Sequence, residues 1–445
     1  MGGISDAFDT LIVGAGAAGL AAASELTAQG QSVCILEARP RVGGRVLTLH
    51  EVGVATPLEL GAEFIHGESP AVLNSLSLAD DIAIDAPQTR WMLQGGRLQP
   101  GESAFDAMKQ GLQKLARTRA DLPFAEFLDR HRRALPGRVR SMAQMLVEGF
   151  DAADPGRVSA LEILKEWGGN SAADAPTFRA RRGYGALLDA MNRSLDPDRT
   201  QLRLGTRVTE LRWRRSVVTA HAERYGEPVQ VRARQAIVTL PLSVMQLPAT
   251  AAGAVQFVPE LSQKRSALAR LAMGPVVKLL LRFSRPFWAE VHEERYRQAA
   301  FFLAPQAPFP TVWTTLPLRT SLLTVWAGGP KASRLDGKST GELVRLALGS
   351  LALMFGRDVP YGRLLEGVYW HDWQRDPFAC GAYSYSLVGS AKARRALSQP
   401  LEGTLFFAGE ATDEEEAASV GGALNSGTQA ARKLLESRPR SRRSK

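Results

Sequence analysis

Three glycines near the start of the chain, at positions 14, 16 and 19, restrict its possible folds more than any other feature. They follow a short apolar run at residues 8–13 (FDTLIV) and open an Ala-rich stretch that predicts a helix up to Gly30. A second apolar run, SVCIL, follows at 32–36. Strand, glycine turn, helix and strand within about thirty residues are typical of the first βαβ unit of a dinucleotide-binding domain.

Each glycine has an expected role in such a unit. Gly14 permits the tight turn, Gly16 lets the backbone approach a diphosphate, and Gly19 lets the helix pack closely on the strand, while the helix N-terminus faces the phosphate charge. Glu37 ends the second strand, about twenty residues further on, where an acid can bind a ribose hydroxyl. The alternative is a glycine-rich turn that binds no ligand.

Length and composition limit the classes of protein to which the chain can belong. With 445 residues, the chain is long enough for two or three domains, and 45% hydrophobic with 22% charged residues is ordinary for a globular protein. No apolar run reaches the roughly 20 residues of a membrane span, and the first residues lack the basic segment of a signal peptide. Cys34 and Cys380 are too few for a disulfide framework. We therefore expect a cytoplasmic protein without a membrane span.

The formal charge of +10 is concentrated in two segments. Residues 437–445 carry five basic and no acidic residues, so without them the charge is 10 − 5 = +5. We expect this short tail to be disordered. Residues 109–140 hold nine basic and three acidic residues, a pattern typical of a solvated helix face. We expect no nucleic-acid partner, because charge alone does not define a site.

The middle of the chain predicts a change in architecture. Residues 70–180 show few strand signals and two helical stretches, at 104–120 and 138–150. Short strands return in QLRLGTRVTELRW, SVVTAHAE, PVQVRA and QAIVTLPL, and further strands are expected at 276–283 and 321–327, before a helix in GELVRLALGSLALMFG. The last elements are a strand in TLFFAGEAT and a helix in VGGALNSGTQAARKLLES.

The run EARPRVGGR at 37–45 distinguishes the expected cofactor. Gly43 and Gly44 offer a second close backbone approach, and Arg39 and Arg45 offer cations to a diphosphate. A nicotinamide enzyme does not need this second element. The run resembles the extended FAD signature of the flavin amine oxidase superfamily, which includes monoamine and polyamine oxidases, L-amino-acid oxidases and flavin-dependent histone demethylases.

The resemblance continues along the chain. ELGAEFIHG at 59–67 is similar to the strand beneath the flavin ring, GTRVTEL places Val208 where the family contacts adenine, and FFAGEAT with SVGGALNSG matches the segment around the ribityl chain and pyrimidine edge. RGYGALLDAM and IVTLPLSVM are similar to further elements of the family's FAD domain. The cofactor-binding residues that it implies are Gly14, Gly16, Ala17, Ala18, Gly19, Glu37, Ala38, Arg39, Gly43, Gly44, Arg45, Gly61, Ala62, Glu63, Phe64, Val208, Trp373, Gly409, Glu410, Ser419 and Val420.

The same resemblance implies an α/β fold class. A Rossmann-like FAD-binding domain of the glutathione-reductase-like, two-dinucleotide type is expected from residues 1–68, 181–245 and 386–436. Residues 69–180 and 246–385 are then a mixed α+β substrate-binding domain with a helical insertion.

Two residues are candidates for catalysis. Lys278 interrupts an apolar strand, where a charge is costly unless it is paired or functional; by resemblance it is the lysine that holds a water against flavin N5, and the alternative is a surface lysine on an edge strand. WHDWQRDPFACGAYSY at 370–385 resembles polyamine oxidases and histone demethylases more than monoamine oxidases. It places Trp373 near the flavin and Tyr383 as an aromatic wall for the amine, the alternative being an ordinary aromatic core pair.

The sequence differs from the monoamine oxidase pattern at two positions of the expected site. Their flavin-linking cysteine corresponds to Ala382, and Cys380 is two residues away, so non-covalent FAD is expected. Their second cage tyrosine corresponds to Ser419, as in the polyamine or demethylase branch. His66 resembles a substrate-facing histidine, although a structural role is equally compatible. Residues 413–416 (DEEE) attract a cationic substrate or form a solvated loop. No metal-ligand spacing is present.

The resemblance therefore implies an amine oxidase, closest in motifs to the polyamine oxidases. Hydride passes from the α-carbon to flavin N5, giving an imine and then an aldehyde, and O2 is reduced to H2O2. A monomer or homodimer is expected. Two alternatives remain open: a desaturase or protoporphyrinogen-type oxidase of the same fold, and a flavin-binding interaction protein without amine turnover.

Overall fold

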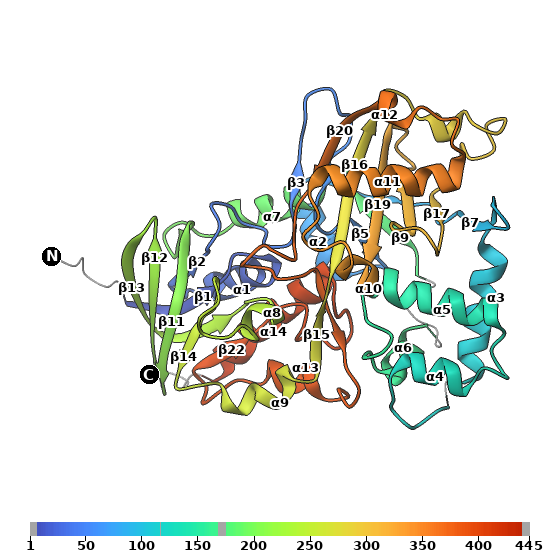
Figure 1. Cartoon of the computed structure of the whole chain (residues 1–445). Coiled ribbons are helices and arrows are strands. Elements are labelled where there is room, and N and C mark those ends of the chain that lie inside the picture. Colours follow the sequence, from blue (N-terminus) through green and yellow to red (C-terminus); the bar gives the residue numbers. More distant parts are fainter. Residues whose placement is uncertain (1–6, 116, 168–174, 438–445) are drawn as a thin grey trace.

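The computed structural model describes residues 7–115, 117–167 and 175–437 and has a mixed α/β architecture with two large sheets (Figure 1). The first sheet has the strand order β10-β2-β1-β13-β12-β11-β14, and β22 pairs with β13. Its strands are β1 (Ala7–Val13), β2 (Val33–Leu36), β10 (Thr200–Arg203), β11 (Thr206–Arg214), β12 (Val217–Arg224), β13 (Glu227–Val238), β14 (Gln256–Val258) and β22 (Leu405–Phe407).

The parallel part of this sheet lies between two apolar cores. Strands β10, β2, β1, β13 and β22 run parallel to one another. Alternate side chains of a strand face opposite sides; accordingly Ile12 and Ile35 pack with the helices, and Leu11 and Leu36 pack with β11 and β12. The helices on the first side are α1 (Ala17–Ala28), α2 (Pro70–Leu78), α7 (Tyr184–Arg193) and α14 (Val420–Glu436).

The second sheet has the order β20-β16-β19-β18-β17-β7-β8. Its strands are β7 (Arg90–Gln94), β8 (Arg97–Pro100), β16 (Val276–Phe283), β17 (Phe301–Leu303), β18 (Thr311–Thr314), β19 (Leu322–Gly328) and β20 (Leu365–Trp370). Helix α11 (Thr340–Phe355) packs against it through Leu343, Ala347 and Leu351. The Ser339 side chain and Glu342 form a capping box that fixes where this helix begins.

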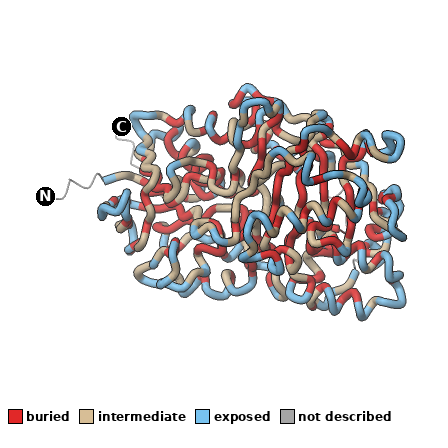
Figure 2. Tube along the Cα trace, turned by 45° about the horizontal axis from the view of Figure 1, so that its top comes forward, coloured by how far each residue is buried: buried red, intermediate tan, exposed pale blue. Residues whose placement is uncertain are grey.

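A group of helices next to the second sheet has its own core. It comprises α3 (Glu102–Lys114), α4 (Phe124–Arg130), α5 (Gly137–Gly149) and α6 (Ala160–Trp167), seen in cyan and green at the right of Figure 1. Figure 2 shows buried chain throughout both halves of the molecule, with exposed segments at the periphery.

Short elements connect these layers. The remaining strands are β3 (Thr48–Leu49), β4 (Leu58–Glu59), β5 (Phe64–His66), β6 (Ala83–Asp85), β9 (Thr177–Ala180), β15 (Leu271–Gly274) and β21 (Tyr383–Ser386). The remaining helices are α8 (Leu242–Met245), α9 (Arg265–Leu268), α10 (Gly329–Ser333), α12 (Tyr361–Leu364), α13 (Ala393–Ser398) and the 3-10 turns Ser262–Lys264 and Phe287–Ala289. Among the described residues, no helix is long and apolar enough to cross a membrane.

The structure differs from the sequence predictions at several places. Residues 70–180 contain not only helices but also β6, β7, β8 and β9, and the helix expected at 104–120 ends at Lys114. PVQVRA and QAIV, expected as separate strands, form one strand, β13. Segments α2 and β14 pack with the first sheet, although the predicted domain division, which stays a prediction, assigns them to the substrate side. The predicted tail disorder concerns residues that, apart from Ser437, lie outside the described part of the chain.

Candidate active site and cofactor cavity

A cavity of about 870 Å³ lies between the first sheet and the second. This volume is at the upper end of the roughly 300–1,000 Å³ range of ligand pockets, enough for a large cofactor and a small substrate. Every residue that the sequence motifs indicated for the site lines it, except Gly19 and Asp413. Segments near residues 14, 40, 62, 278, 383 and 410 therefore meet around one space.

The three N-terminal glycines occupy different surroundings. A Cβ on Gly19 would lie 2.0 Å from the carbonyl oxygen of Gly14, so this position is set by contact between α1 and the turn. Gly14 itself has φ +108°, a conformation that favours glycine. By contrast, a Cβ on Gly16 would meet no atom within 4 Å, because this residue borders the cavity.

Glu37 lies at the end of β2, as expected from the sequence. Its Oε2 accepts a hydrogen bond from the backbone N–H of Ala15, and its Oε1 accepts one from the N–H of Arg39, both at 2.8 Å. Each oxygen has a second lone pair. The carboxylate is thereby fixed beside the glycine turn and retains acceptor capacity for a hydroxyl group in the cavity.

Arg39, expected to meet a diphosphate, is paired with Asp376. Their side chains are 2.7 Å apart, and His371 lies at the same distance from the other oxygen of Asp376. Although burial opposes ionisation, these two hydrogen bonds hold the pKa of Asp376 well below its usual range. The Arg39 side chain thus links the N-terminal unit to the 370–385 segment.

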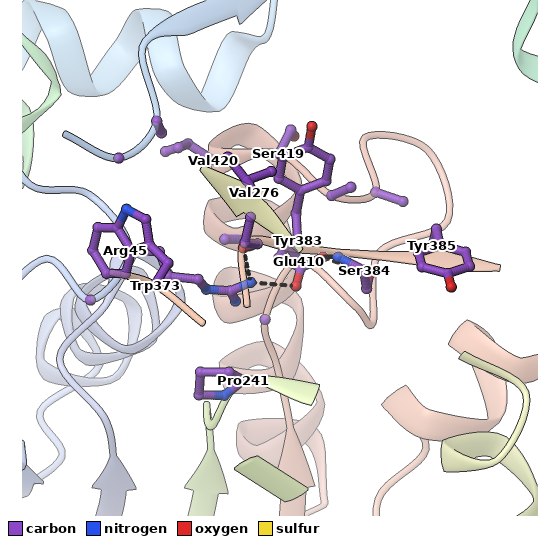
Figure 3. A pocket seen from close by; sticks show the side chains of 18 of the residues that line it. Arg45, Pro241, Val276, Trp373, Tyr383, Ser384, Tyr385, Glu410, Ser419 and Val420 are labelled. Atoms are coloured by element: carbon purple, nitrogen blue, oxygen red, sulfur yellow. Dashed lines mark hydrogen bonds and ion pairs between the residues drawn. The ribbon is translucent and has the colours of Figure 1, made fainter. Parts of the chain in front are cut away.

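Arg45 and Glu410 join two further distant motifs. The Arg45 guanidinium lies 2.8 Å from Glu410 Oε1 and donates to the carbonyl of Ala382 (Figure 3). Ser384 donates its hydroxyl to Glu410, and Arg394 donates to that hydroxyl. Burial opposes ionisation of Glu410, but Arg45 and Arg394 lower its pKa. The sequence analysis did not identify Arg394 or Ser384.

Lys278 is a buried residue of β16, and its partners are defined. Its Nζ lies 2.8 Å from Glu63 Oε2 and donates to the carbonyl of Gly61 at 3.1 Å. Arg179 and Trp313 donate to the other oxygen of Glu63. Lys278 is therefore a paired residue facing the cavity rather than a surface lysine on an edge strand.

The two predicted aromatic residues also border the cavity. Trp373 is buried and donates its Nε1–H to the carbonyl of Leu60 at 2.8 Å. Tyr383 begins β21 and donates its hydroxyl to the carbonyl of Phe150, which fixes the ring orientation (Figure 3). Its pKa is raised well above the usual value by burial and by the nearby Asp151 and Glu166, so the phenol stays neutral.

The residues of the loop before α14 differ in their contacts. The Ser419 hydroxyl accepts from the N–H of Gly422 and so caps α14. Asp413 is buried and accepts from the N–H groups of Glu415 and Glu416, so its carboxylate stabilises the loop. Of the four acids at 413–416, the last three line the cavity.

His66 also borders the cavity, next to aromatic neighbours. Its ring centroid lies 5.1 Å from that of Phe150 and 6.0 Å from that of Phe64. The side chain is exposed to the open cavity, but the surrounding protein limits solvation of the charged ring and lowers its pKa below the usual value, which favours the neutral imidazole. A neutral ring of this kind offers one donor and one acceptor to a ligand.

Two acids of the helical insertion, the buried Asp151 and the half-buried Glu166, were not predicted from the sequence. Asp151 and Glu166 both line the cavity, and Trp167 donates its Nε1–H to Asp151 at 3.1 Å. Burial raises the pKa of both carboxyls, and their mutual repulsion adds to the effect on Asp151. Without a motif around them, no local sequence signal marked these two acids as site residues.

The arrangement fits a dinucleotide cofactor. No side chain caps the N-terminus of α1, so its first N–H groups are available to an anion. The open space at Gly16 is matched at Gly409, where an added Cβ would also meet nothing within 4 Å. Backbone can thus approach a ligand closely from both ends of the chain.

Comparison with known proteins gives a consistent result. Residues 17–435 match the family model described as flavin-containing amine oxidoreductase. Polyamine oxidase 4 of Oryza sativa subsp. japonica is 27% identical over 458 aligned residues, covering 95% of this chain and 87% of that protein. Lysine-specific histone demethylase 1B of Mus musculus is 26% identical, covering 95% of this chain and 52% of that protein.

Solved structures show a similar fold. Wild-type putrescine oxidase bound to putrescine has a TM-score of 0.81 at 19% identity, covering 97% of this chain and 100% of that one. Cyclohexylamine oxidase from Brevibacterium oxydans IH-35A has a TM-score of 0.77 at 22% identity, covering 97% and 99%.

Proposed function

The chain belongs to the family of flavin-containing amine oxidoreductases, and from this premise we propose that it oxidises the carbon next to a neutral amine nitrogen, with FAD held non-covalently and O2 as electron acceptor. One observation carries the proposal most directly. Lys278, Trp373 and Tyr383 border the same cavity as the glycine turn and Glu37, so the predicted chemical groups and the predicted cofactor motif share one space.

In the proposed reaction, FAD would supply the redox chemistry, and residues of the protein would hold the cofactor and orient the amine. Bound flavin would accept the hydride from the α-carbon, leaving an imine that water hydrolyses to an aldehyde, and O2 would take up the electrons as H2O2. The first N–H groups of α1 and Glu37 would hold the diphosphate and ribose. The Tyr383 ring, fixed through Phe150, orients the amine, and Lys278 presents an N–H at the cavity wall.

Non-covalent attachment is supported by the place of Cys380. Its Sγ contacts the carbonyls of Asp376 and Pro377, and it is not among the residues that border the cavity. The FAD-binding domain would then comprise 1–68, 181–245 and 386–436, with 69–180 and 246–385 around the substrate, and α2 and β14 packed on the FAD side. The parallel strand order with β1 at its centre supports a Rossmann-like, two-dinucleotide type of domain.

A positively charged substrate is supported by the acids on the cavity wall. Asp151 and Glu166 lie in the helical insertion, and Glu414, Glu415 and Glu416 lie in the loop before α14. Amines of the polyamine type carry more than one cationic nitrogen, and a carboxylate near the non-reacting nitrogen would add affinity. The polyamine class therefore comes first among the substrates to be tested.

The proposal is tested with purified protein and its bound flavin. The protein should be yellow and should release FAD on denaturation. Under anaerobic conditions, a polyamine should bleach the flavin, whereas a set of arylalkylamines and amino acids serves for comparison. Lys278→Met should retain FAD and slow reduction or reoxidation of the flavin strongly. Absence of bleaching by every amine, with FAD bound, would overturn the proposal.

A further inference from the structure

A buried group of charges lies at the wall of the cavity, next to the segment between β4 and β5 that contains Gly61. It consists of Lys278 from β16, Glu63 before β5 and Arg179 from β9, with Trp313 from β18. The side chains of the first three residues are only 3%, 11% and 12% exposed. Buried charges are costly unless each is paired and hydrogen-bonded. The exact partners in this group therefore matter for the state of Lys278.

The two carboxylate oxygens of Glu63 have different partners. Its Oε1 accepts from Arg179 at 3.1 Å and from Trp313 at 3.0 Å. Arg179 is fixed in turn by the backbone carbonyls of Thr314 and Leu316, and its guanidinium lies over the ring of Phe64. This leaves Oε2 for one partner, the ammonium of Lys278, at 2.8 Å. The carboxylate position is thus set independently of the lysine.

These contacts limit what Lys278 can do. An ammonium has three N–H donors and no lone pair. The ammonium forms an ion pair with Glu63 and donates one N–H to the carbonyl of Gly61, so it has a further N–H to offer to the cavity that Lys278 borders. Glu63 remains ionised beside it: burial opposes ionisation, but Lys278 and Arg179 lower the pKa of Glu63.

We propose that Glu63 is a positioning residue that holds Lys278 as an ammonium with one N–H directed at the cavity, so that Lys278 acts as a charged hydrogen-bond donor and not as a base. The inference rests on the proposed function, because it assigns a task to Lys278 at that site. It concerns only the charge and direction of Lys278, and these can be measured with or without FAD.

The experiment compares Glu63→Gln with Glu148→Gln. Glu148 is a matched control, because it is a buried carboxylate paired with Lys331 at 3.4 Å but does not border the cavity. The Lys278 amine is labelled competitively with acetic anhydride at neutral pH, and the label is quantified by mass spectrometry in FAD-free and FAD-loaded protein. Only a neutral amine reacts, and Glu63→Gln replaces the side chain with one of nearly the same size, so a difference in the Lys278 labelling rate between variant and wild type reports the loss of the proton.

In Glu63→Gln, labelling of Lys278 should rise roughly tenfold or more, because a buried lysine without its anion gives up the proton readily. In Glu148→Gln, Lys278 labelling should match the wild type. The absorption spectrum of bound FAD should depend more strongly on pH in Glu63→Gln than in Glu148→Gln or the wild type. Glu63→Asp keeps the charge and should restore slow labelling in part; it also serves as the test variant if Glu63→Gln does not fold.

Unchanged Lys278 labelling in Glu63→Gln, or in Glu63→Asp if only that variant folds, overturns the inference and leaves Glu63 with a structural role. The outcome is separable from that of the proposed function. A protein that oxidises no amine but shows faster labelling in Glu63→Gln retains the inference and loses the function. If the protein oxidises amines but labelling of Lys278 is unchanged in Glu63→Gln, the proposed function is retained and the inference about Glu63 is lost.

Discussion

The guanidinium of Arg45 lies 2.8 Å from the carboxylate of Glu410, although 365 residues separate them in the chain. Arg45 ends the second glycine motif, and Glu410 follows β22 at the far end of the sequence (Figure 3). The pair thus joins the two segments that the proposed cofactor would contact.

Glu410→Ala should lower both stability and FAD retention. It leaves Arg45 and Arg394 without their carboxylate, and breaking a buried pair typically costs about 3–5 kcal/mol. Thermal unfolding and flavin content after gel filtration measure the two effects. Glu25→Gln is the control, because Glu25 pairs with Arg432 between α1 and α14 at the surface, and its loss should change neither quantity appreciably.

Gly16 and Gly19 should respond in opposite ways to added side chains. Gly16→Val should change the melting temperature of the FAD-free protein less than Gly19→Ala does, since a Cβ at Gly16 would meet no atom within 4 Å, but it should weaken FAD binding by roughly tenfold or more, about 1.4 kcal/mol. Gly19→Ala should lower the melting temperature of the FAD-free protein, because its Cβ would lie 2.0 Å from the Gly14 carbonyl. Equal FAD affinity in Gly16→Val and wild type would contradict the cofactor assignment of this turn.

Asp151→Asn should discriminate between substrates. The variant removes one acid of the pair with Glu166 but keeps a polar group of similar size beside Trp167. Burial and Glu166 favour the protonated acid in the free protein, but a bound cation favours the carboxylate, so we expect KM for a diamine to rise roughly tenfold, as for loss of a charge-assisted hydrogen bond. KM for a monoamine such as benzylamine should change little, which controls for damage to the site. Equal effects on both substrates would remove Asp151 from recognition of the second nitrogen.

Glu59→Gln should remove a pH dependence of stability. Burial raises the pKa of Glu59 from 4.5 to about 7, so between these values the folded state binds more protons and the free energy of unfolding falls as pH rises. Glutamine can still accept from the N–H of Tyr184 and can donate to Thr48, its partners in the wild type. The variant should therefore gain in melting temperature relative to wild type at pH 8 and not at pH 4, measured by calorimetry.

Much of the fold was predictable because its central elements have strong local patterns. The turn at Gly14 with its flanking strands, β16 around Lys278, and the capped helix α11 all coincide with their predictions. The strands within residues 70–180 were not predicted, because each is short and most pair with a partner far along the chain; β7 pairs with β17, and β9 with β5, whereas β8 pairs with the adjacent β7.

Site residues that belong to a sequence motif were predictable. Site residues whose role depends on a contact with a residue far along the chain were not. Nothing in the sequence near Glu63 or Arg179 indicates that both would meet Lys278, since three separate strands must first assemble. The same holds for Asp151 and Glu166, whose importance depends on how α6 packs against the cavity. Residue type and spacing identify candidates, whereas burial and partners decide their charge.

Helix α14 packs so closely on α1 that a Cβ on Gly427 would lie 2.1 Å from the carbonyl of Ala18. The helix that carries the glycine turn is therefore covered by a helix far along the chain. A chain cut short before residue 420 lacks this cover, so FAD should be acquired only after α14 has been made and has packed on α1.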